Sequence, residues 1–219
     1  GLTIYDEVHH TPSKVFSNVF YKVGTKCNLG LSATLKRADG LENVMNWFLG
    51  ETVASIKQVT IKPEIRYVEY YPDELPEDKV LYNGKINIPA MITQVCSDRT
   101  RTELIIKHIR EFYSESRNIL VLTDRRSHCE EIKRSINDLE CGLYLGGMKS
   151  EELDYSNQQR VIIATYAMAS EGYDNPKLDT LILASPKSKV EQAVGRILRR
   201  QNENKKTTTT KNITTTKPT

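Results

Sequence analysis

The sequence lacks long apolar stretches. No run of about 18 apolar residues occurs among its 219 residues, and no charged-then-apolar leader opens it. Neither a membrane-spanning helix nor a secretory signal is therefore predicted, and we expect a soluble, intracellular protein that has no membrane partner.

Cysteine pairs of the kind that bind zinc are also absent. The four cysteines are scattered along the chain without any C-x-x-C spacing. This pattern argues against a zinc cluster and fits reduced thiols in an intracellular setting. We interpret all four as small fillers of the core: Cys27, Cys96, Cys129 and Cys141.

Excess charge of one sign is absent from the body of the chain. The net charge is +3, and residues 201–219 alone hold four lysines against one glutamate, so acidic and basic side chains balance in residues 1–200. Any surface that binds a polyanion must therefore be a local patch. With 38% hydrophobic and 27% charged residues, the composition is that of a globular protein with a sizeable core.

What the sequence does contain is an alternation of short apolar strands and amphipathic helices. After Pro89, a helical run at 102–113 leads to an apolar strand at 118–122. This alternation predicts an α/β fold, in which a parallel sheet carries helices on both faces. The further expected elements are a helix at 127–136 and strands at 142–145, 161–164 and 181–184.

The beginning of the chain shows the same pattern in a shorter form. A strand at 2–5 ends in Asp6 and Glu7, and a strand at 28–31 leads into Ser32-Ala33-Thr34. In open α/β sheets, ligands bind at the carboxyl ends of such strands. Because the first strand starts where the sequence starts, we expect an upstream part of this domain to be missing.

We predict three parts in this chain. Residues 1–57 are expected to be the remnant of a first domain and residues 58–200 a complete second domain. The passage between them is rich in strand-forming residues, and 72–88 is expected to be an exposed excursion. Residues 201–219 include eight threonines and have almost nothing to bury, so we expect a disordered tail.

The stretch 192–200, Gln-Ala-Val-Gly-Arg-Ile-Leu-Arg-Arg, closes the second domain. Its apolar residues recur at helical spacing, which would leave Gln192, Arg196 and Arg199 together on the opposite face. Two guanidinium groups three residues apart suit the oxygens of a phosphate. An amphipathic helix with a solvated basic face explains these nine residues equally well.

The sequence contains four segments that can be compared with known motifs: Asp6-Glu7-Val8-His9, Ser32-Ala33-Thr34, Thr165 to Asp174, and Gln192-x-x-Gly195-Arg196-x-x-Arg199. Together they resemble motifs II, III, V and VI of the superfamily 2 helicases. The resemblance implies RecA-like parallel sheets, with a partial first domain and a complete second one. The D-E-V-H box and the long motif VI most resemble DNA-directed helicases of repair and transcription and similar viral and phage proteins. The four segments follow the family's order and approximate spacing.

The resemblance implies roles in ATP hydrolysis. Asp6 would bind Mg²⁺, through water, and Glu7 would orient and activate the attacking water. Arg196 and Arg199 would approach the γ-phosphate, with Arg199 the stronger candidate for an arginine finger. Solvated acids in a turn at a strand end would explain Asp6 and Glu7 without catalysis.

Other matched residues would touch the nucleotide or couple the sites. Gly172 and Asp174 match the family's G-x-D, whose aspartate meets the ribose or holds the arginines. His9 would touch motif VI at Gln192. Thr165 lies seven residues before Gly172, one more than the commoner spacing of motif V.

The remaining matches concern the nucleic acid. Ser32 and Thr34 would couple the state of the bound nucleotide to the binding of the nucleic-acid strand. Capping of the next turn explains these two residues equally well. Thr123 and Arg125 resemble motif IV, which meets the nucleic-acid backbone. Gly147 would offer a backbone N–H to phosphate, although a plain turn is the simpler interpretation.

One motif of the family is absent. No G-x-x-x-x-G-K-[ST] sequence occurs, so the loop and lysine that hold the β- and γ-phosphates are missing. We therefore expect the C-terminal portion of a helicase or translocase that uses ATP, Mg²⁺ and nucleic acid, with DNA favoured over RNA, and that is inactive without the rest of its first domain. The alternatives are a non-catalytic nucleic-acid-binding module and the motor subunit of a restriction or remodelling complex. Cytoplasm, nucleus and viral factory are equally compatible with the sequence.

Overall fold

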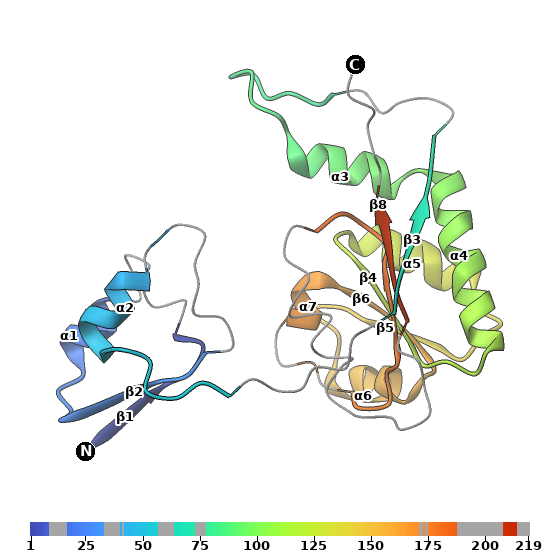
Figure 1. Ribbon diagram of the computed structural model, residues 1–219. Helices are drawn as coiled ribbons and strands as arrows, with labels where there is room; N and C mark the ends of the chain where they lie inside the picture. Colours follow the sequence, from blue (N-terminus) through green and yellow to red (C-terminus); the bar gives the residue numbers. More distant parts are fainter. Residues whose placement is uncertain are drawn as a thin grey trace. The chain divides into compact units, whose positions relative to one another are not determined.

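The computed structural model describes residues 1–8, 17–32, 40, 42–56, 64–72, 78–170, 173, 175–187 and 208–213. The chain divides into two compact units, Gly1–Val59 and Thr60–Thr219 (Figure 1). The sequence placed this division between residues 57 and 58. Both units contain parallel sheets with helices, which confirms the predicted α/β fold class.

The first unit is built on two parallel strands. Strand β1 (Leu2–Tyr5) pairs with β2 (Cys27–Gly30), and the register joins Leu2 to Cys27 and Tyr5 to Gly30. The two helices described here are α1 (Asn18–Lys22) and α2 (Glu42–Leu49). Because the strands are parallel, their carboxyl ends meet at one edge.

Aromatic rings hold the helices of this unit together. The ring of Phe20 on α1 stacks on that of Phe48 on α2 with centroids 4.5 Å apart, and it lies 5.0 Å from the ring of Tyr5. Gly50 follows α2 in the left-handed region, with φ of +83°, as expected for the residue that ends a helix.

The second unit contains a six-stranded, all-parallel sheet with the order β3-β8-β7-β4-β6-β5. The strands are β3 (Glu64–Glu69), β4 (Ile119–Thr123), β5 (Cys141–Tyr144), β6 (Val161–Thr165), β7 (Thr180–Leu183) and β8 (Thr208–Ile213). The helices are α3 (Ile88–Cys96), α4 (Arg99–Ser114), α5 (Arg126–Ser135), α6 (Ser150–Gln158) and α7 (Tyr166–Ser170).

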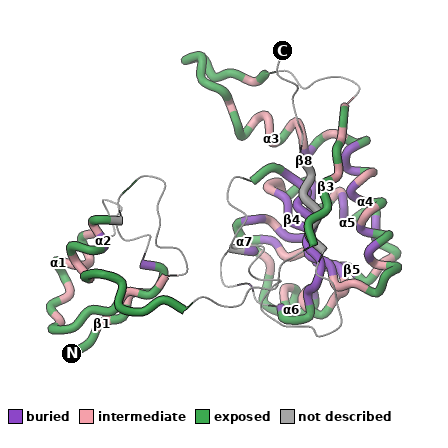
Figure 2. The backbone as a smooth tube through the Cα atoms, in the orientation of Figure 1, coloured by how far each residue is buried: buried purple, intermediate pink, exposed green. Residues whose placement is uncertain are grey.

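Strand β4 lies at the centre of the core, and all five of its residues are buried (Figure 2). Successive side chains of a strand point to opposite faces of the sheet. Ile119 and Val121 accordingly join the apolar cluster under α4 and α5, whereas Leu120 and Leu122 join the cluster under α7. Helices therefore cover both faces, as the sequence predicted.

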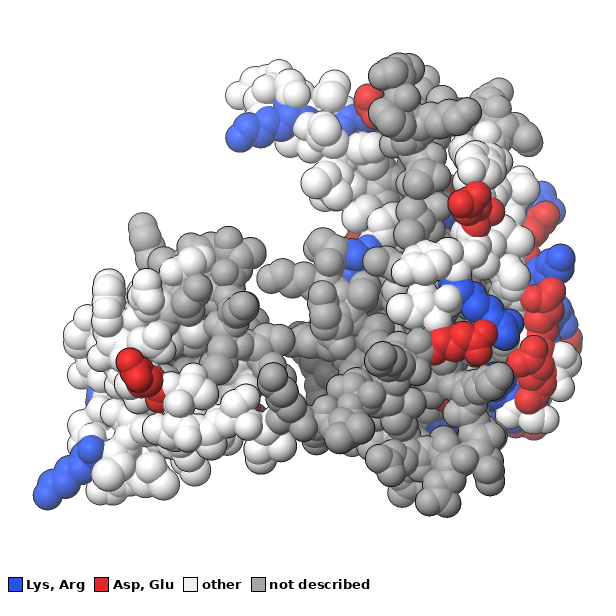
Figure 3. Space-filling model, viewed as in Figure 1, with Lys and Arg blue, Asp and Glu red and all other residues white. Residues whose placement is uncertain are grey.

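The polar surface of α4 is mixed in sign. Figure 3 shows acidic and basic side chains interspersed over α4. Arg99 pairs with Glu103 along that helix, and Arg110 binds Asp138 with N–O distances of 2.7 and 2.8 Å. This alternation of charges on α4 suits solvation, and the helix itself offers no single-sign surface to a polyanion.

The tail differs from the expectation of disorder. Thr208–Ile213 forms β8, which pairs with β3 on one side and β7 on the other. Threonine is β-branched and has a high strand propensity, so a threonine-rich segment adds to a sheet even without an apolar pattern. The remainder of 201–219 lies outside the described residues.

Two further expectations from the sequence concern the cysteines and membrane-spanning helices. Cys96, Cys129 and Cys141 are buried free thiols, but Cys27 is exposed and does not fill the core. None of the helices in the described part of the chain is long and apolar enough to cross a membrane.

Candidate functional site

An exposed acidic pair follows β1 directly. Asp6 and Glu7 form a turn at the carboxyl end of the strand, and the Glu7 N–H donates to Asp6 Oδ1 over 2.9 Å. Glu7 has a φ of +47°, in the left-handed region that non-glycine residues rarely adopt. Such conformations persist where the surroundings enforce them, and they cluster at functional sites.

Backbone hydrogen bonds to the next strand enforce this turn. The Leu31 N–H donates to the Tyr5 carbonyl over 2.8 Å, and the Val8 N–H donates to the Leu31 carbonyl over 2.9 Å. Val8 is buried, and Gly30 leaves room for it, since a Cβ at Gly30 would lie only 3.2 Å from a Val8 methyl. The structure thus brings Asp6 and Glu7 to the same sheet edge as half-buried Ser32.

The side chains at this sheet edge determine what kind of metal ion could bind there. Among the described residues, no group of three or more His, Cys, Asp or Glu side chains is arranged to hold a metal ion. A dedicated protein cage is therefore not formed by them. Mg²⁺, however, is usually held by one or two carboxylates together with phosphate oxygens and waters. An exposed carboxylate such as Asp6 fits that mode.

In the second unit, Thr123 has a packing role. It ends β4 fully buried, and its hydroxyl lies 2.9 Å from Nδ1 of His128. The other ring nitrogen of His128 lies 3.2 Å from the hydroxyl of Thr102. Thr123, which resembled a nucleic-acid contact, therefore does not present its side chain to solvent.

Arg125 is likewise committed to the fold. Its Nη2 donates to the Pro89 carbonyl over 2.7 Å and its Nε to Thr93 Oγ1 over 2.9 Å. Its Nη1 lies 2.6 Å from Asp124 Oδ2. These bonds fasten α3 to the end of β4, so the guanidinium holds a helix in position.

The ends of β4 and β7 are joined by buried polar side chains that the sequence analysis did not identify. Ser185 Oγ accepts from the Asp124 N–H over 2.8 Å, and the Ser185 carbonyl accepts from the Tyr166 hydroxyl over 2.7 Å. Buried Arg101 donates to the Ala184 carbonyl over 2.7 Å, and burial lowers the pKa of its guanidinium. Arg101 lies four residues before inward-facing Ile105, a spacing that placed it on the buried side of α4.

Thr165 lies at a strand end and Gly147 in a turn, and neither position tests the contacts that the resemblance implies for these residues. Thr165 ends β6 beside Thr123, half-buried, and α7 begins at the next residue. Gly147 has a φ of +82°, and no atom lies within 4 Å of a Cβ built on it. It therefore forms an open turn.

Several candidates lie outside the described residues. The structure places none of the side chains of motif VI, and it leaves out the coupling and nucleotide candidates near motifs II, III and V. These residues are His9, Thr34, Gly172, Asp174, Gln192, Arg196 and Arg199.

Comparisons with known proteins relate the chain to helicases. No family model matches it. It is 36% identical over 211 residues to a protein of Acanthamoeba polyphaga mimivirus that carries the provisional name ATP-dependent RNA helicase, a match that covers 92% of this chain and 41% of that protein. The chain spans less than half the length of the curated relatives it matches, from 41% to 49%.

Solved structures share the fold. T4 UvsW matches with a TM-score of 0.51 and 24% identity, over 98% of this chain and 45% of that one. S. cerevisiae Dbp5 bound to RNA and ADP BeF3 matches with a TM-score of 0.59 and 11% identity, over 98% of this chain and 54% of that one. At these identities the likeness concerns the RecA-like fold alone.

Proposed function

We propose that this chain, a relative of the superfamily 2 helicases, is part of an ATP-driven helicase or translocase that moves along nucleic acid. The observation that carries the proposal is the Asp6–Glu7 turn, held in an uncommon backbone conformation at the carboxyl edge that also presents Ser32. The provisional name of the mimivirus relative, an ATP-dependent RNA helicase, supports the same activity.

The residues of this turn divide the chemistry between them. Mg²⁺, when bound with ATP, neutralises charge on the β- and γ-phosphates. Asp6 would supply an exposed carboxylate for that ion, and Glu7 would orient the attacking water and accept its proton. The backbone hydrogen bonds of Val8 and Leu31 hold the turn that carries both carboxylates at the strand end, so its backbone is arranged before the nucleotide arrives.

The expected track is nucleic acid, and the expectation of DNA over RNA has no support among the relatives. The mimivirus relative is named for RNA, and the matching Dbp5 structure contains RNA, so neither supports DNA. Phosphate contacts of the backbone kind do not depend on base sequence. Competition between DNA and RNA strands of one sequence would assign the track.

Replacing the proposed base tests the activity. In the complete protein, Glu7→Gln should reduce nucleic-acid-stimulated ATP hydrolysis by about 10²–10⁴-fold, because a general base typically contributes that much. Glu51→Gln removes another exposed carboxylate in the same unit and should leave the rate unchanged. The 219 residues alone should show no turnover above their own Glu7→Gln variant. Full activity of Glu7→Gln in the complete protein would refute the catalytic assignment.

A further inference from the structure

A short hairpin projects from the second unit just before α3. We call residues 78–87 the arm. Val80 and Ile86 form an antiparallel bridge, the Leu81 N–H donates to the Lys85 carbonyl over 2.7 Å, and the Gly84 N–H donates to the Leu81 carbonyl over 2.9 Å. Gly84 takes a φ of +75°, which a tight turn requires. The arm is therefore an ordered hairpin with its own hydrogen bonds.

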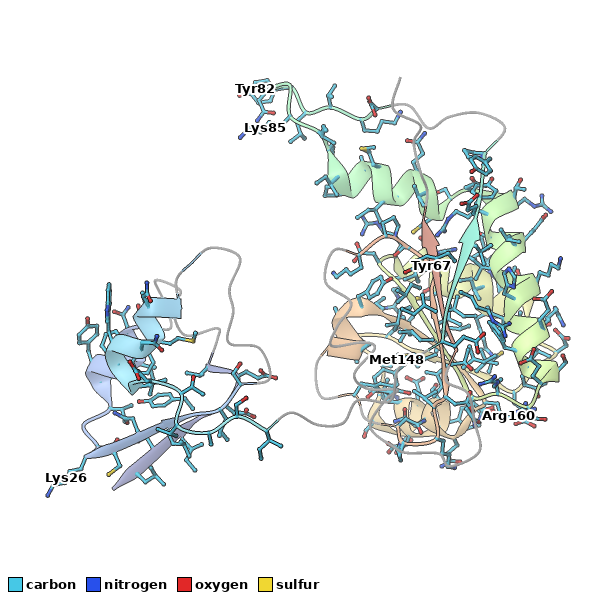
Figure 4. The ribbon with its side chains drawn as sticks, in the orientation of Figure 1. Lys26, Tyr67, Tyr82, Lys85, Met148 and Arg160 are labelled. Carbon is cyan, nitrogen blue, oxygen red and sulfur yellow. The ribbon has the colours of Figure 1, made fainter. Side chains whose placement is uncertain are left out.

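The arm exposes an aromatic ring at its outer end. Tyr82 is fully exposed, and Figure 4 labels it beside Lys85 at that end. Val80 and Ile86, the bridging pair, are each 62% exposed. Large apolar side chains gathered on one exposed element mark an interaction surface.

The charge of this segment favours an anionic partner. The arm contains two lysines, Lys79 and Lys85, against one acidic residue, Asp78, and no further acidic residue occurs until Asp98. Elsewhere on this unit acidic and basic side chains alternate, as the pairs along α4 show. Lys85 is exposed at the end of the arm, so its ammonium group is placed to meet a phosphate.

The base of the arm is fixed to the sheet. Asn87 caps α3 by accepting from the Ala90 N–H over 3.2 Å, and its own N–H donates to the Lys79 carbonyl over 2.7 Å. Arg125 then holds α3 itself, because it donates hydrogen bonds to the Pro89 carbonyl and to Thr93 Oγ1. A rigid base means that the free energy of a contact at the arm's end is not spent on ordering the hairpin.

We propose that Tyr82 stacks on a base of single-stranded nucleic acid while Lys85 binds the neighbouring phosphate. The inference rests on the proposed function and adds a contact site to it. An aromatic face stacks on any base, so the contact is independent of sequence. Arg125, in this arrangement, acts as a positioning residue that holds the arm and does not touch the strand.

Binding by the 219-residue chain tests the arm directly. Fluorescence anisotropy with a labelled single-stranded oligonucleotide should show affinity lowered about 5- to 100-fold by Tyr82→Ala, and kept by Tyr82→Phe, which retains the ring. Tyr155→Ala, which removes another largely exposed tyrosine, on α6, is the matched control and should bind as the wild type does. Lys85→Ala should lower the salt dependence of log K by about one unit of slope.

A spectroscopic readout separates stacking from a general loss of affinity. A 2-aminopurine base in the oligonucleotide should be quenched at saturation by the wild type and by Tyr82→Phe, but less by Tyr82→Ala, because stacking quenches its fluorescence. If Tyr82→Ala showed the same affinity and the same quenching as the wild type, the proposed contact of the arm would be refuted. The proposed ATP-driven activity would not be affected by that result. If the wild-type chain bound no single-stranded nucleic acid, the proposed contact of the arm would also be refuted. The Glu7→Gln assay would then still test ATP hydrolysis independently.

Discussion

His128 is a neutral imidazole enclosed between two threonine hydroxyls. Burial lowers its pKa from 6.5 to about 4, and the nearby charge of Arg101 adds to the effect. Its ring nitrogens lie within hydrogen-bond distance of Thr102 and Thr123, so one nitrogen donates and the other accepts. The ring thereby joins α4, α5 and the end of β4.

This depressed pKa predicts an acid-sensitive contribution to stability. The unfolded chain takes up a proton near pH 6.5, whereas folded His128 resists it until about pH 4. The contribution is therefore complete above pH 6.5 and decreases by roughly 3 kcal/mol as the pH falls to 4. Urea denaturation across this range should show wild type and His128→Gln converging in unfolding free energy towards low pH. A difference that stays constant with pH would contradict the prediction.

The site residues show what a sequence can and cannot predict at this scale. Asp6 and Glu7 were placed at a strand end because an apolar run preceded them, and the structure puts them there. Thr123 also followed an apolar run, yet its hydroxyl is turned inward. Its partner His128 is five residues away on a helix, and only the packed structure brings that ring beneath the strand.

At the scale of elements, α6 packs tightly on β5 because Gly142 has no side chain. A Cβ at Gly142 would lie 2.6 Å from the Cα of Ser156, a backbone atom that moves only with its helix. Gly142→Ala should therefore lower the unfolding free energy by about 1–3 kcal/mol. Gly146→Ala is the control, since its Cβ would meet only Met168 Sδ at 3.7 Å, and it should stay within about 0.5 kcal/mol of the wild type. Chemical denaturation of both variants would test this, and equal stabilities would refute it.

Elements with strong periodicity were predictable from the sequence, and those without it were not. The apolar run of β4 and the spacing of Ile105, Ile109 and Phe112 on α4 gave both elements nearly at their observed bounds. Strand β8 has no apolar alternation to detect. It pairs with strands from distant parts of the sequence, and such pairing depends on tertiary context more than on local pattern.

At the scale of the whole molecule, β8 makes the end of the chain part of the second unit. Removing residues 208–219 should leave β3 without its described partner and turn β7 into an edge strand. We expect the unfolding free energy to fall by at least about 2 kcal/mol, since several ladder hydrogen bonds are lost at about 1 kcal/mol each.

Hydrogen exchange provides the measurement for this truncation. Amides of Thr180–Leu183 should exchange faster in the shortened chain, because one side of β7 becomes accessible. A chain that lacks only 214–219 is the control and keeps β8 whole. Unchanged protection and stability after removal of 208–219 would support the original expectation of a disordered tail.

The position of β8 also bears on how the protein is made. Glu64 near the start of the second unit pairs with Thr208 near its end, so this pairing has a very large sequence separation. During synthesis β3 leaves the ribosome long before its partner strand exists, and the edge of β7 that will pair with β8 also has unpaired backbone groups until then. Chaperone protection of the nascent chain is therefore needed most in the interval before Thr208–Ile213 leaves the ribosome.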